Sequence, residues 1–262
     1  MKKKLFLGID AGSSRTKAVL TDENKKIAGY AVKKSGVNFS KAANLCLTQA
    51  LSNAAASVSD IKSAVFTGYG RNNIFIEVPK AVKTEISCHA KGCYAYFPYE
   101  ITVIDIGGQD NKLIKINKNS KIESFKMNRK CAAGTGAFLE EMALRLDIPV
   151  SELNNLAEKS ENMVKLGSFC TVFSATEVLE NIQKGVKIFD IAKGIFHSVI
   201  KRVFEMDSLT KTIVITGGVV AHNPFIIKMA TGAAPDKKIL TPALPQFTGA
   251  FGAALYASNS TA

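Results

Sequence analysis

A pattern that occurs twice, 95 residues apart, constrains the fold more than any other feature of the sequence. In each copy an apolar run of strand length ends in aspartate and then glycine, at Asp10-Ala-Gly12 after residues 4–9 and at Asp105-Ile-Gly107-Gly108 after residues 100–104. Two segments with strand-like alternation follow each copy, and helical spacing comes next. We therefore predict an α/β protein built by divergent duplication of a three-strand meander and a βα unit. Two unrelated α/β domains are the alternative.

The two copies also set the expected domain boundaries. Residues 1–98 form the N-terminal half and residues 99–248 the C-terminal half, which carries Cys131 and Cys170. The small residues within 249–258 predict a helix suited to close packing, and we expect it to pack back on the N-terminal half. The other expected strands are 16–21, 27–32, 63–67, 112–116, 121–126 and 212–216, and the other expected helices include 40–56, 85–96 and 190–204.

Composition excludes several classes of protein. Of the 262 residues, 47% are apolar and 21% charged, which is typical of a folded protein and not of a disordered chain. The formal net charge is +12, and +9 of it lies in residues 1–98. These basic residues are dispersed singly and the chain has no tryptophan, so we expect no nucleic acid partner. An acidic protein or a phosphate-rich ligand suits the charge better.

Neither end of the chain predicts a membrane segment. The uncharged stretch 239–262 contains Pro242, Pro245 and Gln246, whose polar groups hydrocarbon would leave unsatisfied. The basic start at residues 1–4 resembles that of a secretory leader, but the apolar run after it covers only residues 5–9 before an aspartate. We therefore expect a cytoplasmic protein that does not contact a membrane.

Three predicted strand ends carry glycine and are candidate phosphate-binding loops. Glycine lets backbone amides approach a polyphosphate, and the hydroxyls of Ser13 and Ser14 add donors. A carboxylate before each of two loops suits hydrated magnesium. Neither loop has a Walker or GxGxxG sequence, and the alternative is that both aspartates are ordinary turn residues. Lys17 either reaches the phosphates or is solvated. The three strand ends are Asp10-Ala-Gly12, Asp105-Ile-Gly107-Gly108 and Thr216-Gly217-Gly218.

Two of the five cysteines form a candidate metal site. Cys131 precedes a helix predicted from the spacing of apolar residues 138–146, and Cys170 precedes Ser174-Ala-Thr-Glu177, a capping-box pattern. A helix N-terminus favours a thiolate or an anionic cluster. An iron–sulfur cubane needs four thiolates, which a symmetric dimer supplies from two such pairs. The alternative is that both are ordinary buried cysteines.

The other cysteines favour structural roles. Their odd total and wide scatter favour thiols or metal ligands over disulfides. Cys88-His89 with Cys93 is a second candidate metal site, but it lacks a fourth ligand at an informative spacing. Cys46 lies in an apolar helical pattern and is expected in the core.

Together the motifs resemble one protein family over residues 7–257. The motifs are Gly8-Ile-Asp10-Ala-Gly-Ser13, Thr67-Gly-Tyr-Gly-Arg71, Ser87-Cys-His-Ala90, Val103-Ile-Asp-Ile-Gly-Gly-Gln-Asp110, Met127-Asn128 with Lys130-Cys-Ala-Ala-Gly-Thr-Gly136, Cys170-Thr-Val-Phe173, Thr216-Gly-Gly-Val219 and Gly249-Ala-Phe-Gly-Ala-Ala-Leu-Tyr256. The family they resemble is the activators of 2-hydroxyacyl-CoA dehydratases, which are related to the ATP-binding subunits of benzoyl-CoA reductase.

The resemblance implies an actin-like ATPase fold of two ribonuclease-H-like domains with a nucleotide cleft between them. It implies a homodimer that holds one [4Fe–4S] cluster through Cys131 and Cys170 of each chain. Such proteins take one electron from ferredoxin or flavodoxin. On ATP hydrolysis they deliver it to an iron–sulfur enzyme that dehydrates a 2-hydroxyacyl-CoA. The implied cofactors are the cluster, ATP or ADP, and Mg²⁺.

The resemblance also assigns the nucleotide site, with Asp10, Asp105 and Gln109 as catalytic residues. The phosphate and magnesium loops correspond to Asp10, Gly12, Ser13, Asp105, Gly107, Gly108 and Gln109, and the rest of the nucleotide to Gly217, Gly218, Gln246 and Gly249.

The chain departs from the family pattern in two places. One acidic residue is absent at Ser174-Ala-Thr-Glu177, and the loop 218–223 is one residue longer than usual. Other functions left open are a reductase for a double-cubane or benzoyl-CoA-reductase-type partner, an N-acetylglucosamine-type kinase, and a non-catalytic nucleotide switch or zinc-binding scaffold.

Overall fold

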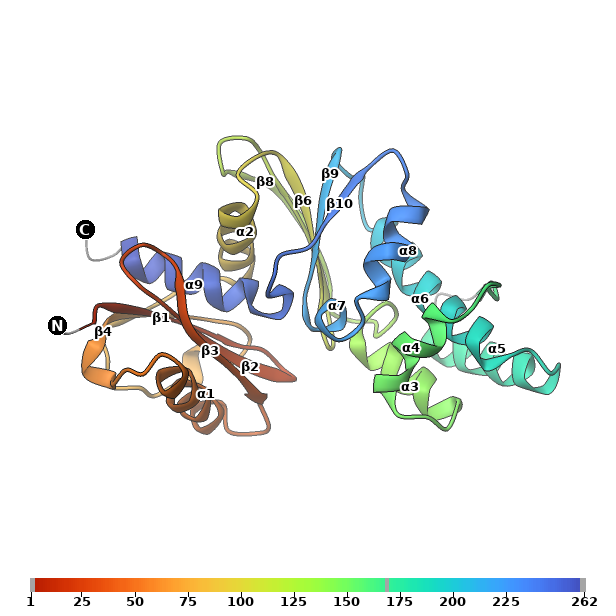
Figure 1. The fold of residues 1–262 in the computed structure, drawn as a ribbon, viewed down its shortest axis with the longest axis horizontal. Coiled ribbons are helices and arrows are strands. Elements are labelled where there is room, and N and C mark those ends of the chain that lie inside the picture. Colours follow the sequence, from red (N-terminus) through yellow and green to blue (C-terminus); the bar gives the residue numbers. More distant parts are fainter. Residues whose placement is uncertain (1–2, 168–169, 260–262) are drawn as a thin grey trace. The chain divides into compact units, whose positions relative to one another are not determined.

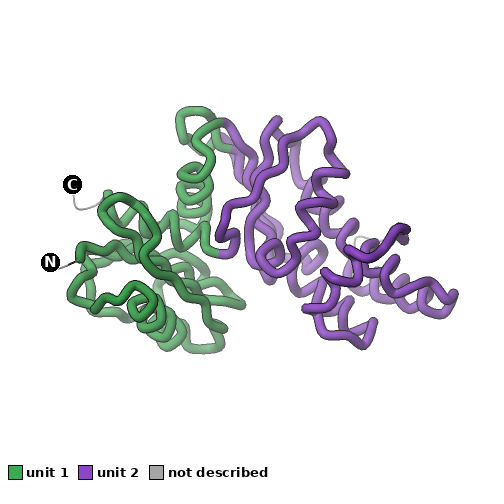
Figure 2. The backbone as a smooth tube through the Cα atoms, viewed as in Figure 1, with its two compact units in different colours: residues 1–99, 116–122, 247–262 green, residues 100–115, 123–246 purple. Residues whose placement is uncertain are grey.

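A computed structural model of the protein describes residues 3–167 and 170–259. The chain divides into two compact units (Figure 2). Unit 1 comprises Met1–Tyr99, Ile116–Ile122 and Phe247–Ala262, and unit 2 comprises Glu100–Lys115 and Glu123–Gln246. The C-terminal helix therefore belongs with the N-terminal part of the chain, although all of unit 2 lies between them in sequence.

Unit 1 contains a five-stranded sheet with the order β3-β2-β1-β4-β5 (Figure 1). β2 pairs antiparallel with β1 and β3, whereas β4 runs parallel to β1 and β5 parallel to β4. The strands are β1 Leu5–Ala11, β2 Arg15–Thr21, β3 Ile27–Lys34, β4 Ile61–Thr67 and β5 Lys80–Val82. The helices are α1 Phe39–Asn53, α2 Glu85–Tyr96 and α9 Thr248–Asn259.

Alternate side chains of β1 enter two different cores, as expected of a strand buried on both faces. Leu7 and Ile9 pack in the core that contains the buried residues of α1. Phe6 packs with residues of α2 and α9 in a second, smaller core. Asp10 lies four residues after Phe6 on β1, so its side chain is on the same face of the strand, which is the face that α9 covers.

The backbones of α2 and α9 pack directly against each other because glycines leave no side chains between them. A Cβ atom on Gly252 would lie 1.8 Å from the Cys88 carbonyl oxygen, and one on Gly92 would lie 2.1 Å from that of Thr248. α9 also crosses β1 at Gly8, whose Cβ would lie 1.9 Å from a carbonyl oxygen of the helix. The small residues of α9 thus give the close packing predicted from the sequence.

Unit 2 repeats the strand order of unit 1. Its sheet has the order β8-β7-β6-β9-β10. In this order the first three strands of the unit run from the edge to the centre and the last two follow, just as in β3-β2-β1-β4-β5 of unit 1. β9 runs parallel to β6 and β10 parallel to β9. The predicted duplication is therefore confirmed in topology. The strands are β6 Ile101–Ile106, β7 Asn111–Ile116, β8 Ile122–Asn128, β9 Thr212–Thr216 and β10 Lys238–Leu240.

The helices of unit 2 bury a large apolar core with its sheet. Ile104 and Ile106 of β6 pack there with Phe138 and Phe196. The predicted amphipathic stretch 190–204 is confirmed as part of α6, whose apolar residues line this core. The helices are α3 Gly136–Arg145, α4 Leu153–Glu158, α5 Thr171–Gln183, α6 Ile188–Phe204, α7 Gly218–His222 and α8 Phe225–Ala233.

The predicted capping box at Ser174 is wrong. α5 begins at Thr171 with Cys170 as its N-cap residue, so Ser174 lies inside the helix. Ser174 is buried, and its amide donates to the Cys170 carbonyl oxygen at 2.8 Å. The helix therefore begins about one turn before the position that the local cap signal predicts. Within residues 3–167 and 170–259, no helix is both long and apolar enough to cross a membrane.

Candidate functional site

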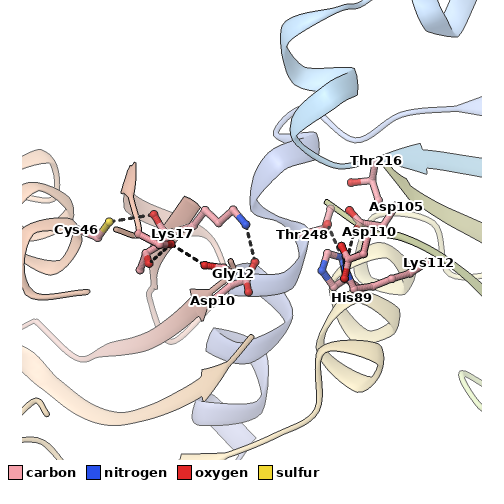
Figure 3. Close-up of polar contacts among 12 residues, drawn as sticks. Asp10, Gly12, Lys17, Cys46, His89, Asp105, Asp110, Lys112, Thr216 and Thr248 are labelled. Carbon is pink, nitrogen blue, oxygen red and sulfur yellow. Dashed lines mark hydrogen bonds and ion pairs between the residues drawn. The ribbon is translucent and has the colours of Figure 1, made fainter. Parts of the chain in front are cut away.

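Asp10 is the penultimate residue of β1, and its carboxylate is buried and paired with a lysine. Its side chain accepts from Lys17 Nζ, with 2.9 Å between the nitrogen and Oδ2 (Figure 3). The antiparallel register of β1 and β2 places Asp10 directly opposite Lys17. The structure therefore holds the Lys17 ammonium against a carboxylate, which decides against a lysine that is simply solvated.

The turn after Asp10 depends on glycine. The Gly12 amide donates to the Arg15 carbonyl oxygen at 3.1 Å. A Cβ atom on Gly12 would lie 3.0 Å from that oxygen and 3.3 Å from Lys17 Nζ. Ser13 is exposed and Ser14 partly exposed in the same turn. An ammonium, serine hydroxyls and a bare glycine backbone thus meet at one loop, an arrangement suited to an anion.

Asp105 occupies the equivalent place at the end of β6 and is also paired with a lysine. Lys112 Nζ lies 3.2 Å from Asp105 Oδ2 and 2.9 Å from Asp110 Oδ1 (Figure 3). The Lys112 side chain is only 6% exposed. Sequence reasoning missed Lys112 and Asp110. The available signal was the separation of seven residues between aspartate and lysine, which occurs in both copies.

The predicted third loop lies beside Asp105. Gly217 has a φ of 106°, and a Cβ there would lie 2.3 Å from the Ile106 carbonyl oxygen and 2.8 Å from Asp105 Oδ1. Its amide donates to the Pro245 carbonyl oxygen at 3.0 Å. The Gln246 side chain borders the space next to Gly218. The structure therefore brings Asp105, Gly217, Gly218 and Gln246 together within unit 2.

The loop after Asp105 holds the start of α3. The amide of Gly136 donates to the Gly107 carbonyl oxygen at 2.9 Å, and that of Ala137 to the Gly108 carbonyl oxygen at 2.8 Å. Gly107 and Asp110 close the loop itself through an amide-to-carbonyl bond of 2.9 Å. Gly108 and Gln109 are exposed at its tip. The two first amides of α3 are thus anchored on a candidate phosphate loop.

Gly249 lies in unit 1, next to His89, which the sequence suggested only as a candidate metal ligand with Cys88 and Cys93. A Cβ on Gly249 would lie 2.9 Å from His89 Nε2 and 3.3 Å from Asp10 Oδ2. His89 Nδ1 and Thr248 Oγ1 are 3.2 Å apart (Figure 3). His89 is buried on α2. The structure thus places His89, part of the motif Ser87-Cys-His-Ala90, near the Asp10 carboxylate, with Gly249 next to both.

Cys131 and Cys170 both lie in unit 2, and neither is buried. The alternative that they are ordinary core cysteines is therefore wrong. Cys170 is exposed at the N-cap of α5, whereas Cys131 is partly exposed and lies four residues before Thr135, the N-cap of α3. Cys131 thus precedes a helix, as predicted, and a turn closed by the Thr135 amide and the Ala132 carbonyl oxygen lies between them.

The segment around Cys131 is held by a neighbouring asparagine. Asn128 Nδ2 donates to the Cys131 carbonyl oxygen at 3.0 Å, and the Cys131 amide donates to Asn128 Oδ1 at 3.3 Å. α3 and α5 pack against each other, so the two cysteines precede two neighbouring helices. Among the described residues, no group of three or more His, Cys, Asp or Glu side chains is arranged to hold a metal ion. One chain therefore offers two thiols here.

The three other cysteines are buried in unit 1. Burial raises the pKa of Cys46 to about 11 and that of Cys88 to about 12, so both stay protonated thiols at neutral pH. A protonated thiol is a poor metal ligand. Cys93 is fully buried as well. These observations favour the structural role expected for Cys46 and Cys88.

Comparison with known proteins gives the family. The BadF/BadG/BcrA/BcrD ATPase family matches residues 7–257. The chain is 40% identical over 259 residues to the (R)-2-hydroxyglutaryl-CoA dehydratase activating ATPase of Acidaminococcus fermentans, covering 98% of each protein.

Solved structures agree with this match. The activator of the 2-hydroxyisocaproyl-CoA dehydratase from Clostridium difficile, with bound ADPNP, superposes with a TM-score of 0.89 at 38% identity, over 98% of this chain and 95% of that one. A ROK family glucokinase from Streptomyces griseus has a TM-score of 0.61 at 14% identity over 97% of this chain and 99% of that one. The second likeness concerns the fold alone, which is that of actin-like ATPases and sugar kinases. The chain therefore belongs to the BadF/BadG/BcrA/BcrD ATPase family.

Proposed function

We propose that the chain is an ATP-driven activator of a 2-hydroxyacyl-CoA dehydratase. Two copies hold one [4Fe–4S] cluster, accept one electron from ferredoxin or flavodoxin, and deliver it to the iron–sulfur dehydratase on ATP hydrolysis. The observation that carries the proposal is the anchoring of α3, which follows Cys131, on the glycine loop after Asp105. The names of the relatives support the activator role.

The glycine loops of both units bind ATP in this proposal. Backbone amides approach the phosphate oxygens, and an ammonium and hydroxyls add donors. Gln109, exposed at its loop, orients the attacking water. The residues assigned to phosphate are Gly12, Ser13, Ser14, Lys17, Gly107 and Gly108, and those assigned to the rest of the nucleotide are Gly217, Gly218, Gln246 and Gly249.

Asp10 and Asp105 suit magnesium by the chemistry of their donors. Carboxylate oxygens are hard ligands, and Mg²⁺ keeps several waters between itself and a protein. In the structure each carboxylate already accepts from an ammonium, Lys17 or Lys112, so each position favours a cation. When bound, magnesium neutralises charge on the transferred phosphoryl group. Asp10 and Asp105 are the carboxylates that would hold such an ion, through its water ligands.

Cys131 and Cys170 suit an iron–sulfur cluster by number and exposure. A cubane takes four thiolates, and each chain supplies two that reach the surface. Val172 and Phe173, two and three residues after Cys170, are large apolar side chains left exposed, which favours cover by a second protein surface. The cluster supplies one-electron chemistry. Each ~1.4 kcal/mol by which the surrounding residues favour its oxidised form lowers the potential by roughly 60 mV.

Anaerobic purification and metal analysis test the proposal. A brown protein with about four irons per pair of chains is expected from four-thiolate ligation. Cys131→Ala and Cys170→Ala are each expected to lose the colour and retain ADP binding in calorimetry. Cys46→Ala is the matched control, since this buried cysteine should leave the colour unchanged. Colour retained in both surface variants would contradict the assignment.

A functional assay tests the activator role itself. Reduced ferredoxin, ATP and the chain are mixed with an inactive, oxidised 2-hydroxyacyl-CoA dehydratase, and dehydration of its substrate is followed. Activity is expected only when ATP and the reduced donor are both present. Full activation by ADP, or by donor without nucleotide, would contradict ATP-driven electron delivery.

A further inference from the structure

Asn111 joins the glycine loop of unit 2 to the segment that carries Cys131. It is the first residue of β7, directly after the loop 107–110, and its side chain is fully buried. Its Nδ2 donates to the Gly134 carbonyl oxygen at 2.9 Å. Gly134 lies three residues after Cys131, in a left-handed conformation with a φ of 79°. One buried side chain thus spans the two loops.

The side chains packed around Gly134 restrict movement of its loop relative to Asn111. A Cβ atom on Gly134 would lie 3.2 Å from Asn111 Nδ2 and 3.1 Å from the Cγ atom of Arg202 on α6. The loop is therefore enclosed between the asparagine and the helix. Close-packed groups transmit a displacement because they cannot compress to absorb it.

Stability alone does not explain why residue 111 is an asparagine. Its Oδ1 is buried and has no hydrogen-bond partner among the described residues. An unsatisfied buried acceptor is unfavourable, and a smaller or apolar residue would avoid it. What the asparagine adds is the donor that holds Gly134.

We propose that Asn111 is a positioning residue that transmits nucleotide-dependent displacement of the loop 107–110 to the segment 131–136. The inference rests on the proposed function, because it takes the loop 107–110 to be a phosphate-binding loop. The backbone hydrogen bonds from Gly136 and Ala137 to that loop also couple it to the segment after Cys131. Asn111 differs from them in that a side-chain substitution removes its bond.

Hydrogen–deuterium exchange of the full-length chain, with and without Mg²⁺ and ADP, tests the proposal. In the wild type, ADP is expected to slow exchange about fivefold or more in residues 107–112 and in 131–137, the lower end of usual allosteric coupling. In Asn111→Ala the slowing in 107–112 is expected to remain, and that in 131–137 to fall below about twofold. Asn111→Asp, which keeps the size and loses the donor, is expected to behave likewise if the alanine variant folds poorly.

Asn154→Ala is the matched control. Asn154 is a buried asparagine of the same unit, and its Oδ1 accepts from the Phe225 amide at 3.0 Å. It is expected to keep the wild-type response in both segments. A second readout is the rate of iodoacetamide labelling at Cys131, read by mass spectrometry in iron-free protein. ADP is expected to change that rate in the wild type and in Asn154→Ala, and not in the Asn111 variants.

The outcomes separate this inference from the proposed function. A response in 131–137 that survives in both Asn111 variants would overturn the inference, as would a wild type that responds only in 107–112. A wild type that responds in neither segment would contradict the nucleotide site itself, and the inference with it.

Discussion

The Asp10 and Asp105 regions occupy equivalent places in two sheets of the same strand order, yet they differ in charge and exposure. Each aspartate is the penultimate residue of the central strand and pairs with the lysine seven residues later. Lys17 serves one carboxylate and is partly exposed, whereas Lys112 serves two and is buried. The duplication thus preserved a charge pair while the two lysines acquired different environments.

A pair of glycines repeats in the same way. Gly68 follows β4 with a φ of 93°, and a Cβ there would lie 2.5 Å from the Ala11 carbonyl oxygen. Gly217 follows β9 with a φ of 106° and meets the carbonyl oxygen of Ile106, the residue after Asp105. The motif around Gly68 therefore matches the Thr216-Gly-Gly loop. At Gly217 a Cβ would also lie 2.8 Å from Asp105 Oδ1.

The difference between the copies suggests a division of labour. The first leaves an ammonium accessible beside an open turn, which suits contact with a ligand. The second buries its ammonium between two carboxylates and ties its glycine loop to α3, which suits transmission to the cysteines. Four predictions test how far this division extends.

Replacement of the two lysines should have the largest and most unequal effects. Lys112→Met removes the ammonium from two carboxylates in a buried setting and is expected to destabilise the fold by ~3–5 kcal/mol. Lys17→Met affects one carboxylate at a more open position and is expected to lose ~1–3 kcal/mol. Urea unfolding followed by circular dichroism measures both. Equal losses would mean that the two pairs are energetically alike.

Alanine at the paired glycines should give similar losses of stability but different effects on binding. Gly68→Ala and Gly217→Ala each force a side chain into a left-handed conformation and are expected to lose ~1–3 kcal/mol. Gly217→Ala also places a methyl group 2.8 Å from Asp105 Oδ1, so it alone is expected to weaken ADP binding in calorimetry. Equal weakening by Gly68→Ala would show that the first loop shares this role.

The buried thiols of Cys46 and Cys88 make the stability of unit 1 sensitive to alkaline pH. Burial raises the pKa of Cys88 to about 12, whereas a thiol in an unfolded chain titrates near ~8.5. The stability from the neutral thiol is complete below the unfolded value and declines as pH rises toward the folded one. Above pH ~8.5 the free energy of unfolding is expected to fall by up to ~1.4 kcal/mol per pH unit for such a thiol.

Comparison of Cys88→Ala with the wild type isolates this contribution. The variant is expected to lose stability less steeply between pH ~8.5 and ~10.5, as measured by urea unfolding at each pH. Cys46→Ala should flatten the profile in the same direction, because burial also raises the pKa of that thiol. Parallel profiles for all three proteins would contradict the assigned burial.

The smallest expected effect is a gain. Thr21, fully buried at the end of β2, has a hydroxyl without a partner among the described residues. The equivalent position in the second copy is Ile116. Thr21→Val is therefore expected to stabilise the fold by ~1 kcal/mol, seen as a higher midpoint of thermal unfolding. A loss would indicate that the hydroxyl has a role in the first copy only.

Much of the fold was predictable because its signals are local. The apolar runs that end at Asp10 and Asp105, the tight turns and the spacing of α6 each lie within a short stretch of chain. The helix 85–96 and the strand 212–216 occur with the predicted bounds. The start of α5 was mispredicted because the amide of Ser174 bonds to the Cys170 carbonyl oxygen, so the helical bonds begin before the local capping pattern.

The sequence by itself determined the repeated architecture, the glycine loops and the two cysteines of interest, since periodicity and motif are properties of the chain in order. Only the tertiary structure decided which groups meet: Lys112 with two carboxylates, Asn111 with Gly134, and His89 with Thr248. These contacts depend on strand register and helix packing, which arise from many weak interactions across the fold. The contacts of Asn111 with Gly134 and of His89 with Thr248 join separate segments of the chain, so no single stretch of sequence encodes them.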